Sequence, residues 1–153
     1  MRTDSHSRCV RDGLAIRRLS SILLVPMLLT GCLQSAGPPP IALGTPCAAC
    51  GMEIRDLRFA CERRATTAWR AYDSIECLLR AGSIAEGVYL TDYDRKTLHP
   101  ADSLWVVRGE FPSPMGGGFA AFLDRGPAEE IAGSRRGRVG RLADFARPEG
   151  GSP

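Results

Sequence analysis

Short runs of alternating polar and apolar residues dominate the first half of the region that follows residue 46. Over 54–63, Leu57, Phe59 and Cys61 alternate with polar or small neighbours, a pattern that predicts a half-buried strand. The apolar and aromatic residues of 66–72 predict its hairpin partner. We expect Asp73 or Ser74 to cap a short helix that reaches about residue 81, where Gly82 ends it.

A second group of elements follows with a similar plan. The pattern predicts strands over 87–93, 103–109 and 119–123, and a short helix over 128–132 with Pro127 in its first turn. Apolar residues within 139–145 are expected to return to the core. Strands followed by a helix, twice over, predict an α+β fold in which two small lobes form one compact domain.

The segment before this region has the features of a bacterial export signal. Arg17 and Arg18 precede a short apolar run over 22–29, which is too short to span a bilayer as a helix. The run ends in Leu-Thr-Gly before Cys32, as at a lipoprotein cleavage site. We therefore predict a signal peptide over 1–31, lipidation of Cys32 and a place in the bacterial cell envelope, anchored to the membrane and facing the periplasm.

Composition divides the rest of the chain into three parts. Three consecutive prolines lie near the middle of 32–45, which predicts an extended tether. The folded domain is expected over 46–146, and the Gly- and Pro-rich residues 147–153 are expected to be a disordered tail.

Net charge argues against a nucleic-acid partner. The formal charge of the 153 residues is +3, and the predicted signal peptide holds five Arg against two Asp. The exported part is therefore neutral, and its composition predicts no basic face for nucleic acid.

Sulfur ligands are concentrated at the start of the predicted domain. Cys47, Cys50 and Met52 lie within six residues, and Met115 lies in a loop of proline and glycines, 113–118. Thiolate and thioether sulfur select Cu(I), zinc or iron–sulfur centres, and zinc sites seldom use thioether. We therefore expect these two loops to close on one Cu(I) per chain, with Cys50 and Met52 on one face of an extended segment.

Several motifs, in order, resemble the NosL-type lipoproteins, which are copper-binding accessory proteins of nitrous oxide reductase assembly. They include Cys50-Gly51-Met52, the segments 72–77 and 91–93, and Pro114-Met115-Gly116 with Ala121-Phe122. The resemblance covers about residues 46–145. It implies two ββαβ-like lobes, a periplasmic location, Cu(I) delivery to an apo copper enzyme, and ligand roles for Cys50, Met52 and Met115.

Two other functions remain open from the cysteines alone. The pair Cys47 and Cys50 has the spacing of an envelope thiol-disulfide oxidoreductase, although no strand precedes it as in a thioredoxin-like motif. With Cys61 and Cys77 the same pair could form a four-thiolate zinc site in an interaction domain.

No residue pattern indicates an enzyme. The sequence has no catalytic triad, and its glycine run lacks the lysine of a phosphate loop. His99 could complete a copper site but is expected at the surface, as are Asp92 and Asp94. These features favour a binding protein.

Overall fold

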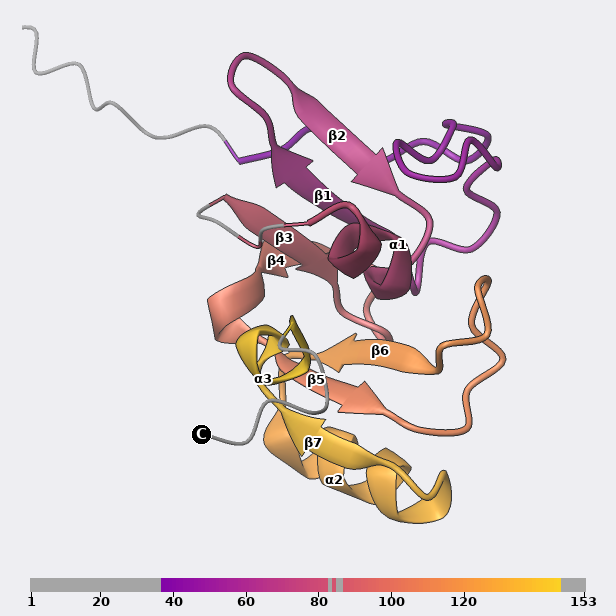
Figure 1. Ribbon diagram of the computed structural model, residues 1–153. Helices are drawn as coiled ribbons and strands as arrows, with labels where there is room; N and C mark the ends of the chain where they lie inside the picture. Colours follow the sequence, from indigo (N-terminus) through magenta and orange to yellow (C-terminus); the bar gives the residue numbers. More distant parts are fainter. Residues whose placement is uncertain (1–36, 83, 85–86, 147–153) are drawn as a thin grey trace, which may run out of the picture. The chain divides into compact units, whose positions relative to one another are not determined.

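The first lobe is a four-stranded antiparallel sheet with one short helix. The computed structural model describes residues 37–82, 84 and 87–146. The sheet has the order β2-β1-β3-β4, and the helix α1 follows β2 (Figure 1). Its elements are β1 (Cys61–Arg64), β2 (Trp69–Tyr72), α1 (Ile75–Arg80), β3 (Val88–Thr91) and β4 (Leu98–Pro100).

The predicted strand over 54–63 begins only at Cys61. Upstream of it, the Asp56 carboxylate accepts hydrogen bonds from the backbone N–H of Arg58 and from its guanidinium, at 3.0 Å and 2.6 Å. An aspartate that bonds the backbone two residues on favours a turn, and residues 57–59 form one. The alternating apolar pattern of 54–63 still predicted burial correctly at Phe59, which is 2% exposed.

The second lobe is a three-stranded antiparallel sheet with the order β6-β5-β7. Helix α2 contacts all three strands of this sheet. Its elements are β5 (Trp105–Arg108), β6 (Phe119–Phe122), α2 (Arg125–Ser134), β7 (Arg138–Gly140) and α3 (Leu142–Ala146), after a 3-10 turn at Ala101–Ser103. The predicted α+β class with two small lobes is confirmed; β4 and β7 were not predicted as strands.

A shared core joins the two lobes. Helix α1 contacts β1, β2 and β6, so it packs between elements of both sheets. One cluster of buried residues contains Cys77 and Leu78 from α1, Leu90 from β3, Val106 from β5 and Ala121 from β6. The two lobes therefore share a hydrophobic core.

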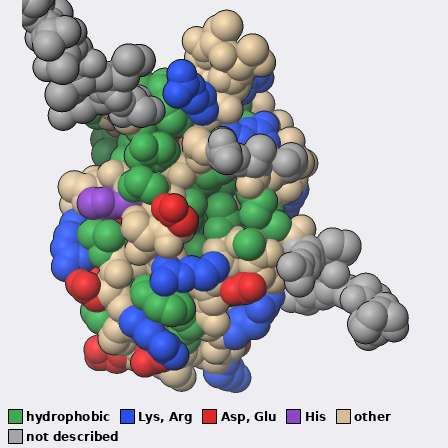
Figure 2. All heavy atoms as spheres, turned by 90° about the vertical axis from the view of Figure 1, so that its left-hand side faces the viewer, with side chains coloured by type: hydrophobic (Ala, Val, Ile, Leu, Met, Phe, Trp, Pro, Cys, Tyr) green, Lys and Arg blue, Asp and Glu red, His purple; other side chains and the backbone are tan. Residues whose placement is uncertain are grey.

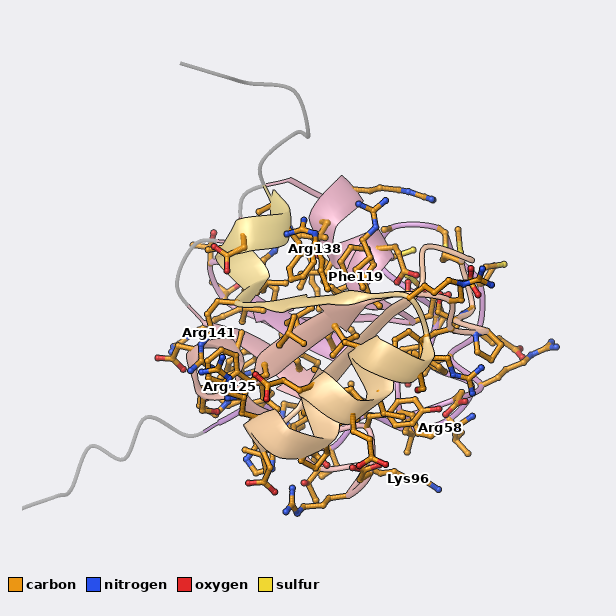
Figure 3. All side chains as sticks on the ribbon, turned by 90° about the horizontal axis from the view of Figure 1, so that it is seen from below. Arg58, Lys96, Phe119, Arg125, Arg138 and Arg141 are labelled. Carbon is orange, nitrogen blue, oxygen red and sulfur yellow. The ribbon has the colours of Figure 1, made fainter. Side chains whose placement is uncertain are left out.

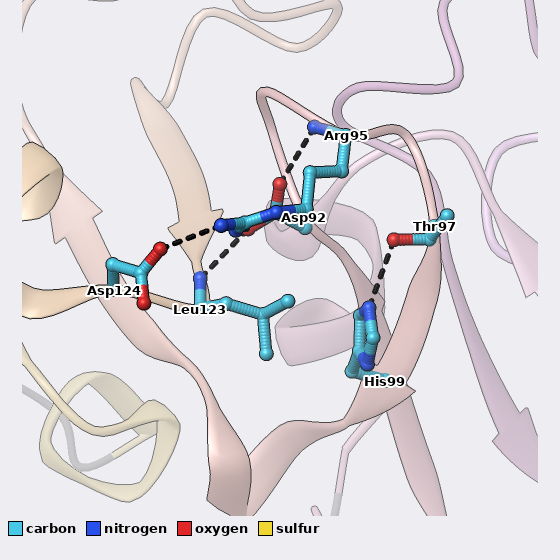
Figure 4. A network of polar contacts seen from close by, with 6 residues as sticks. All are labelled: Asp92, Arg95, Thr97, His99, Leu123 and Asp124. Atoms are coloured by element: carbon cyan, nitrogen blue, oxygen red, sulfur yellow. Dashed lines mark hydrogen bonds and ion pairs between the residues drawn. The ribbon is translucent and has the colours of Figure 1, made fainter.

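Asp92 links the lobes through hydrogen bonds (Figure 4). It is 1% exposed, contrary to the expected surface position. Its carboxylate accepts from the Arg95 backbone N–H at 2.7 Å, which closes the β3–β4 turn, and from the Leu123 N–H at 2.7 Å, at the end of β6. Arg95 also pairs with Asp124 at 2.7 Å. One buried carboxylate thus ties the turn of the first lobe to a strand of the second.

Part of the predicted tether lies against the first lobe. Pro38, Pro40 and Ile41 line a cavity of about 280 Å³ together with Leu57 and Leu98. The signal peptide, Cys32 and the tail 147–153 lie outside the described residues. Within the described part of the chain, no helix is long and apolar enough to cross a membrane.

Several arginines cover aromatic rings (Figure 3). The guanidinium carbons of Arg141 and Arg125 lie 3.7 Å and 5.0 Å from the centre of the Trp105 ring, and that of Arg138 lies 4.0 Å from the Phe145 ring. On the face shown in Figure 2, charged side chains of both signs lie among apolar ones.

We predict that Asp92→Ala lowers the free energy of unfolding by about 1–3 kcal/mol, because it leaves two partly buried N–H donors without their acceptor. Asp92→Asn keeps one acceptor oxygen and should cost about half as much. Urea denaturation measures both. The control is Asp94→Ala, an exposed carboxylate two residues away, which should change stability by less than about 0.5 kcal/mol. Equal effects at the two positions would contradict the linking role of Asp92.

Candidate metal centre

The CxxC segment is the tip of a small backbone loop over residues 44–54. Gly44 N–H donates to Ile54 O, and Ile54 N–H donates to Thr45 O, both at 2.9 Å. Nearer the tip, Cys47 N–H donates to Met52 O at 2.8 Å, and Gly51 N–H returns to Cys47 O at 2.9 Å. Gly51 has φ +77°, a conformation that glycine adopts without strain. The backbone therefore holds the two cysteines in one tight turn.

A backbone hydrogen bond attaches this loop to the sheet. Ala48 N–H donates to Ala71 O in β2 at 2.9 Å. The chain leaves β2 at Tyr72 and starts α1 two residues beyond Asp73, with Ser74 as the N-cap. The Ser74 hydroxyl accepts from the Cys77 N–H at 3.3 Å. The loop tip is thus placed beside the segment that carries Asp73 and Cys77.

Three sulfurs and one carboxylate meet there. One ligand atom from each of Cys47, Cys50, Cys77 and Asp73 lies within 4.8 Å of all the others. All four described cysteines are free thiols. Cys47, Asp73 and Cys77 are 1–3% exposed, whereas Cys50 is exposed. We call these four residues the thiol cluster; it could hold a metal ion with one ligand reachable from solvent.

The electrostatics of the thiol cluster favour a bound cation. Burial raises the pKa of the Cys77 thiol well above its ordinary value, and hydrogen bonds with Asp73 and Cys50 act in the same direction. The Asp73 Oδ1 atom is buried and has no hydrogen-bond partner among the described residues. A buried carboxylate oxygen without a donor is rare in folded proteins, and a metal ion or its bound group would satisfy it.

A groove borders the cluster at the surface. It encloses about 610 Å³, and its lining includes Met52, Phe59, Asp73, Pro112 and Pro114. The loop 44–54 and the loop before β6 lie on the same side of the molecule (Figure 1). Asp73 is the residue that the groove and the cluster share, and the three cysteines of the cluster do not line the groove.

The two methionines predicted as ligands lie at different depths near the cluster. Met52 is 48% exposed and lines the groove. Met115 is partly buried and packs against the core that contains Cys47 and Cys77. The predicted extended segment from Cys50 to Met52 is wrong, because Cys50 lies in a turn and Gly51 has positive φ.

Cys61 and His99 lie outside the cluster among the described residues. The Cys61 thiol is fully buried and donates to Ser74 O at 3.4 Å, and burial raises its pKa well above the ordinary value. His99 is in β4, and its Nε2 is 2.8 Å from the Thr97 hydroxyl. The predicted four-cysteine zinc site is therefore wrong in one ligand: the residues that come together are three of the cysteines and Asp73, and Cys61 is not among them.

Sequence reasoning did not identify Asp73 as a ligand and gave Cys77 only a subsidiary role. A usable signal was present, because Asp73 immediately precedes the cap residue Ser74 and Cys77 lies in the first turn of the helix, so the two residues are close in sequence. The contact of both with Cys47 depends on chain folding over more than twenty residues.

The cluster does not have the arrangement of a redox dithiol. Residues 48–50 form a turn, and the more accessible thiol is the second cysteine of the pair. The attacking thiol of a CxxC oxidoreductase is activated at the start of a helix, which this turn does not supply.

Comparison with known proteins supports the fold. No family model and no curated protein sequence matches the chain. Among solved structures, the crystal structure of the copper chaperone NosL from Shewanella denitrificans is similar, with a TM-score of 0.57 and 20% sequence identity over 70% of this chain and 96% of that chain. The chain therefore shares the NosL fold, which confirms the architecture that the sequence resemblance implied.

Burial predicts the order in which the thiols react. In reduced, metal-free protein, Cys50 should be alkylated at least about tenfold faster than Cys47, Cys61 or Cys77, because those need a local opening that costs about 1.4 kcal/mol or more. The raised pKa values of Cys61 and Cys77 slow them further. Peptide mass spectrometry after timed alkylation measures each site. Fast labelling of Cys77 would contradict this geometry.

Proposed function

We propose that the protein binds one Cu(I) through the thiolates of Cys47, Cys50 and Cys77 and transfers it to an apo copper enzyme. The observation that carries this proposal is the convergence of three sulfurs within 4.8 Å of one another and of the Asp73 carboxylate, which also lines an open groove. Soft thiolates favour Cu(I) over hard cations, and the ion replaces the protons of buried thiols.

The methionines supply the selectivity in this proposal. A thioether adds a soft donor without adding charge, which favours Cu(I) over Zn(II). Met52 at the groove is suited to the first contact with an entering ion, and Met115 to closing the site from the core side. Asp73 contributes negative charge beside the ion.

Release proceeds by ligand exchange. Cys50 is the exposed ligand of the cluster, so a donor of the client attacks copper there, forming one copper–ligand bond as the bond to Cys50 breaks. No electron is transferred, and the copper remains Cu(I). We propose nitrous oxide reductase as the client; copper analysis of the two proteins after mixing and separation tests this, and an apo-reductase that gains no copper would refute it.

A zinc site is the second candidate. Three thiolates and one carboxylate within 4.8 Å also form a suitable tetrahedral ligand set for Zn(II). Such a site would be closed and structural, whereas a groove and an exposed cysteine suit a transferred ion better.

Substitutions at the cluster decide between these functions. We expect Cys47→Ser, Cys50→Ser and Cys77→Ser each to lower the Cu(I) affinity by at least about 100-fold, more than a ligand-supporting residue does. Met52→Leu should lower it by about tenfold and leave Zn(II) binding unchanged. Equilibrium competition with Cu(I) and Zn(II) chelators, without oxygen, measures both affinities.

Cys61→Ser is the matched control, because serine keeps the donor to Ser74 O and Cys61 lies outside the cluster. It should bind Cu(I) as the unsubstituted protein does. Preferred binding of Zn(II) by the unsubstituted protein would support the second candidate instead. A different result would refute both metal functions: the unsubstituted protein binds no copper but has disulfide reductase activity, and either Cys47→Ser or Cys50→Ser abolishes that activity.

We also propose that the chain is a lipoprotein of the cell envelope, anchored at Cys32. The basis is the Arg17-Arg18 pair, the apolar run and the Leu-Thr-Gly-Cys sequence. Mass spectrometry of protein extracted from membranes should show Cys32 as the acylated N-terminus, while Cys32→Ala should abolish acylation. A soluble product that begins at another residue would refute this anchor.

A further inference from the structure

A buried polar contact fastens the Met115 loop to the helix that carries Cys77. The Glu76 side chain is 6% exposed and the Ser113 side chain is similarly buried. The Ser113 hydroxyl donates to Glu76 Oε1 at 2.6 Å, across 37 residues of sequence. Burying a carboxylate away from a protein cation is unfavourable, so this contact has a cost that a surface serine and glutamate would not incur.

The same hydroxyl fixes the shape of the loop. Ser113 Oγ accepts from the Gly118 N–H at 3.0 Å, and Ser113 O accepts from the Gly116 N–H at 3.0 Å. These two bonds close residues 113–118 on themselves, with Met115 inside the closed segment. The orientation of the Met115 side chain therefore depends on Ser113.

Glu76 fixes the position of the loop on α1. A Cβ atom at Gly117 would collide with the Glu76 side chain, so the backbone of the loop rests directly on that carboxylate. Glu76 immediately precedes Cys77. One side chain thus sets the distance between the loop that carries Met115 and the cluster that carries Cys77.

We infer that Ser113 and Glu76 are positioning residues that hold the Met115 thioether toward the copper site. This inference rests on the proposed function. The contact, which we call the Ser113–Glu76 latch, holds the loop that carries Met115 against α1, whose Cys77 belongs to the thiol cluster. Without it, Met115 remains in the chain but is no longer oriented for coordination.

The test is a double-substitution cycle on Cu(I) affinity, measured on the full chain by chelator competition without oxygen. Ser113→Ala should weaken Cu(I) binding by about tenfold, because misplacing one ligand costs about as much as a single hydrogen bond or ligand contact. In the Met115→Leu background, Ser113→Ala should have no further effect. Glu76→Gln keeps an acceptor oxygen and should bind as the unsubstituted protein does, while Glu76→Ala should behave like Ser113→Ala.

Ser134→Ala is the control, because it also removes a hydroxyl that donates a hydrogen bond, here to the Ile131 backbone carbonyl at 3.0 Å in the exposed part of α2. A copper-free readout accompanies it: Ser113→Ala should raise the rate of peroxide oxidation of Met115, mapped by mass spectrometry, and leave Met52 unchanged.

Three outcomes overturn the inference separately from the proposed function. Ser113→Ala could lower the Cu(I) affinity equally in the unsubstituted protein and in the Met115→Leu background. That result would mean that the latch acts only through the general stability of the fold. Unchanged affinity in Met115→Leu would remove Met115 from the site while the cysteine ligands remain. Unchanged Met115 oxidation in Ser113→Ala would mean that the latch does not orient the loop. Failure of the proposed function would show differently, as unsubstituted protein that binds no Cu(I).

Discussion

The hydrogen bond from Ala48 N–H to Ala71 O is the constraint on which the candidate site depends. It attaches the tip of the loop 44–54 to the end of β2, just before the segment that carries Asp73 and Cys77. It holds the CxxC turn against the end of β2, where three sulfurs and the Asp73 carboxylate meet. Cys47 and Cys77 are buried there, and Cys50 is exposed. In the proposed function, a soft cation replaces the protons of these thiols.

The two lobes contribute unequally to this site. The first lobe supplies the thiols and the carboxylate, while the second supplies the loop with Met115 and one wall of the groove. The site therefore requires that the lobes keep a fixed relation to each other. Asp92 maintains that relation on the side of the β3–β4 turn, and the shared core around α1 maintains it in the centre. In the proposed function, the thiolates come from the first lobe and the Met115 thioether from the second, so a fixed relation between the lobes keeps these donors together.

The likeness to NosL describes the fold of the chain and does not identify its ligands. At 20% identity, the likeness shows how the chain is arranged and leaves the chemistry to the residues present. Here those residues include three clustered thiols, more than the single cysteine that the sequence resemblance implied. A richer thiolate set binds Cu(I) more tightly and also suits Zn(II), so selectivity must come from the thioethers and from the open groove. Metal competition is therefore the informative measurement for this chain.

Sequence by itself determined the α+β class, the two lobes, the helix that Ser74 caps, and the concentration of sulfur ligands in the Cys47–Met52 segment. These follow from local rules: alternation reports burial, serine caps a helix, and soft ligands close in sequence suggest a soft metal. Tertiary structure decided the rest. It placed Asp73 and Cys77 in the thiol cluster, while the Cys61 thiol donates a hydrogen bond to Ser74 O instead. It also buried Asp92 and brought Glu76 into hydrogen-bond contact with Ser113. Each of these depends on contacts between residues far apart in the chain, and a hydrophobic or polar pattern records only that a side chain is buried, never which distant side chain it meets.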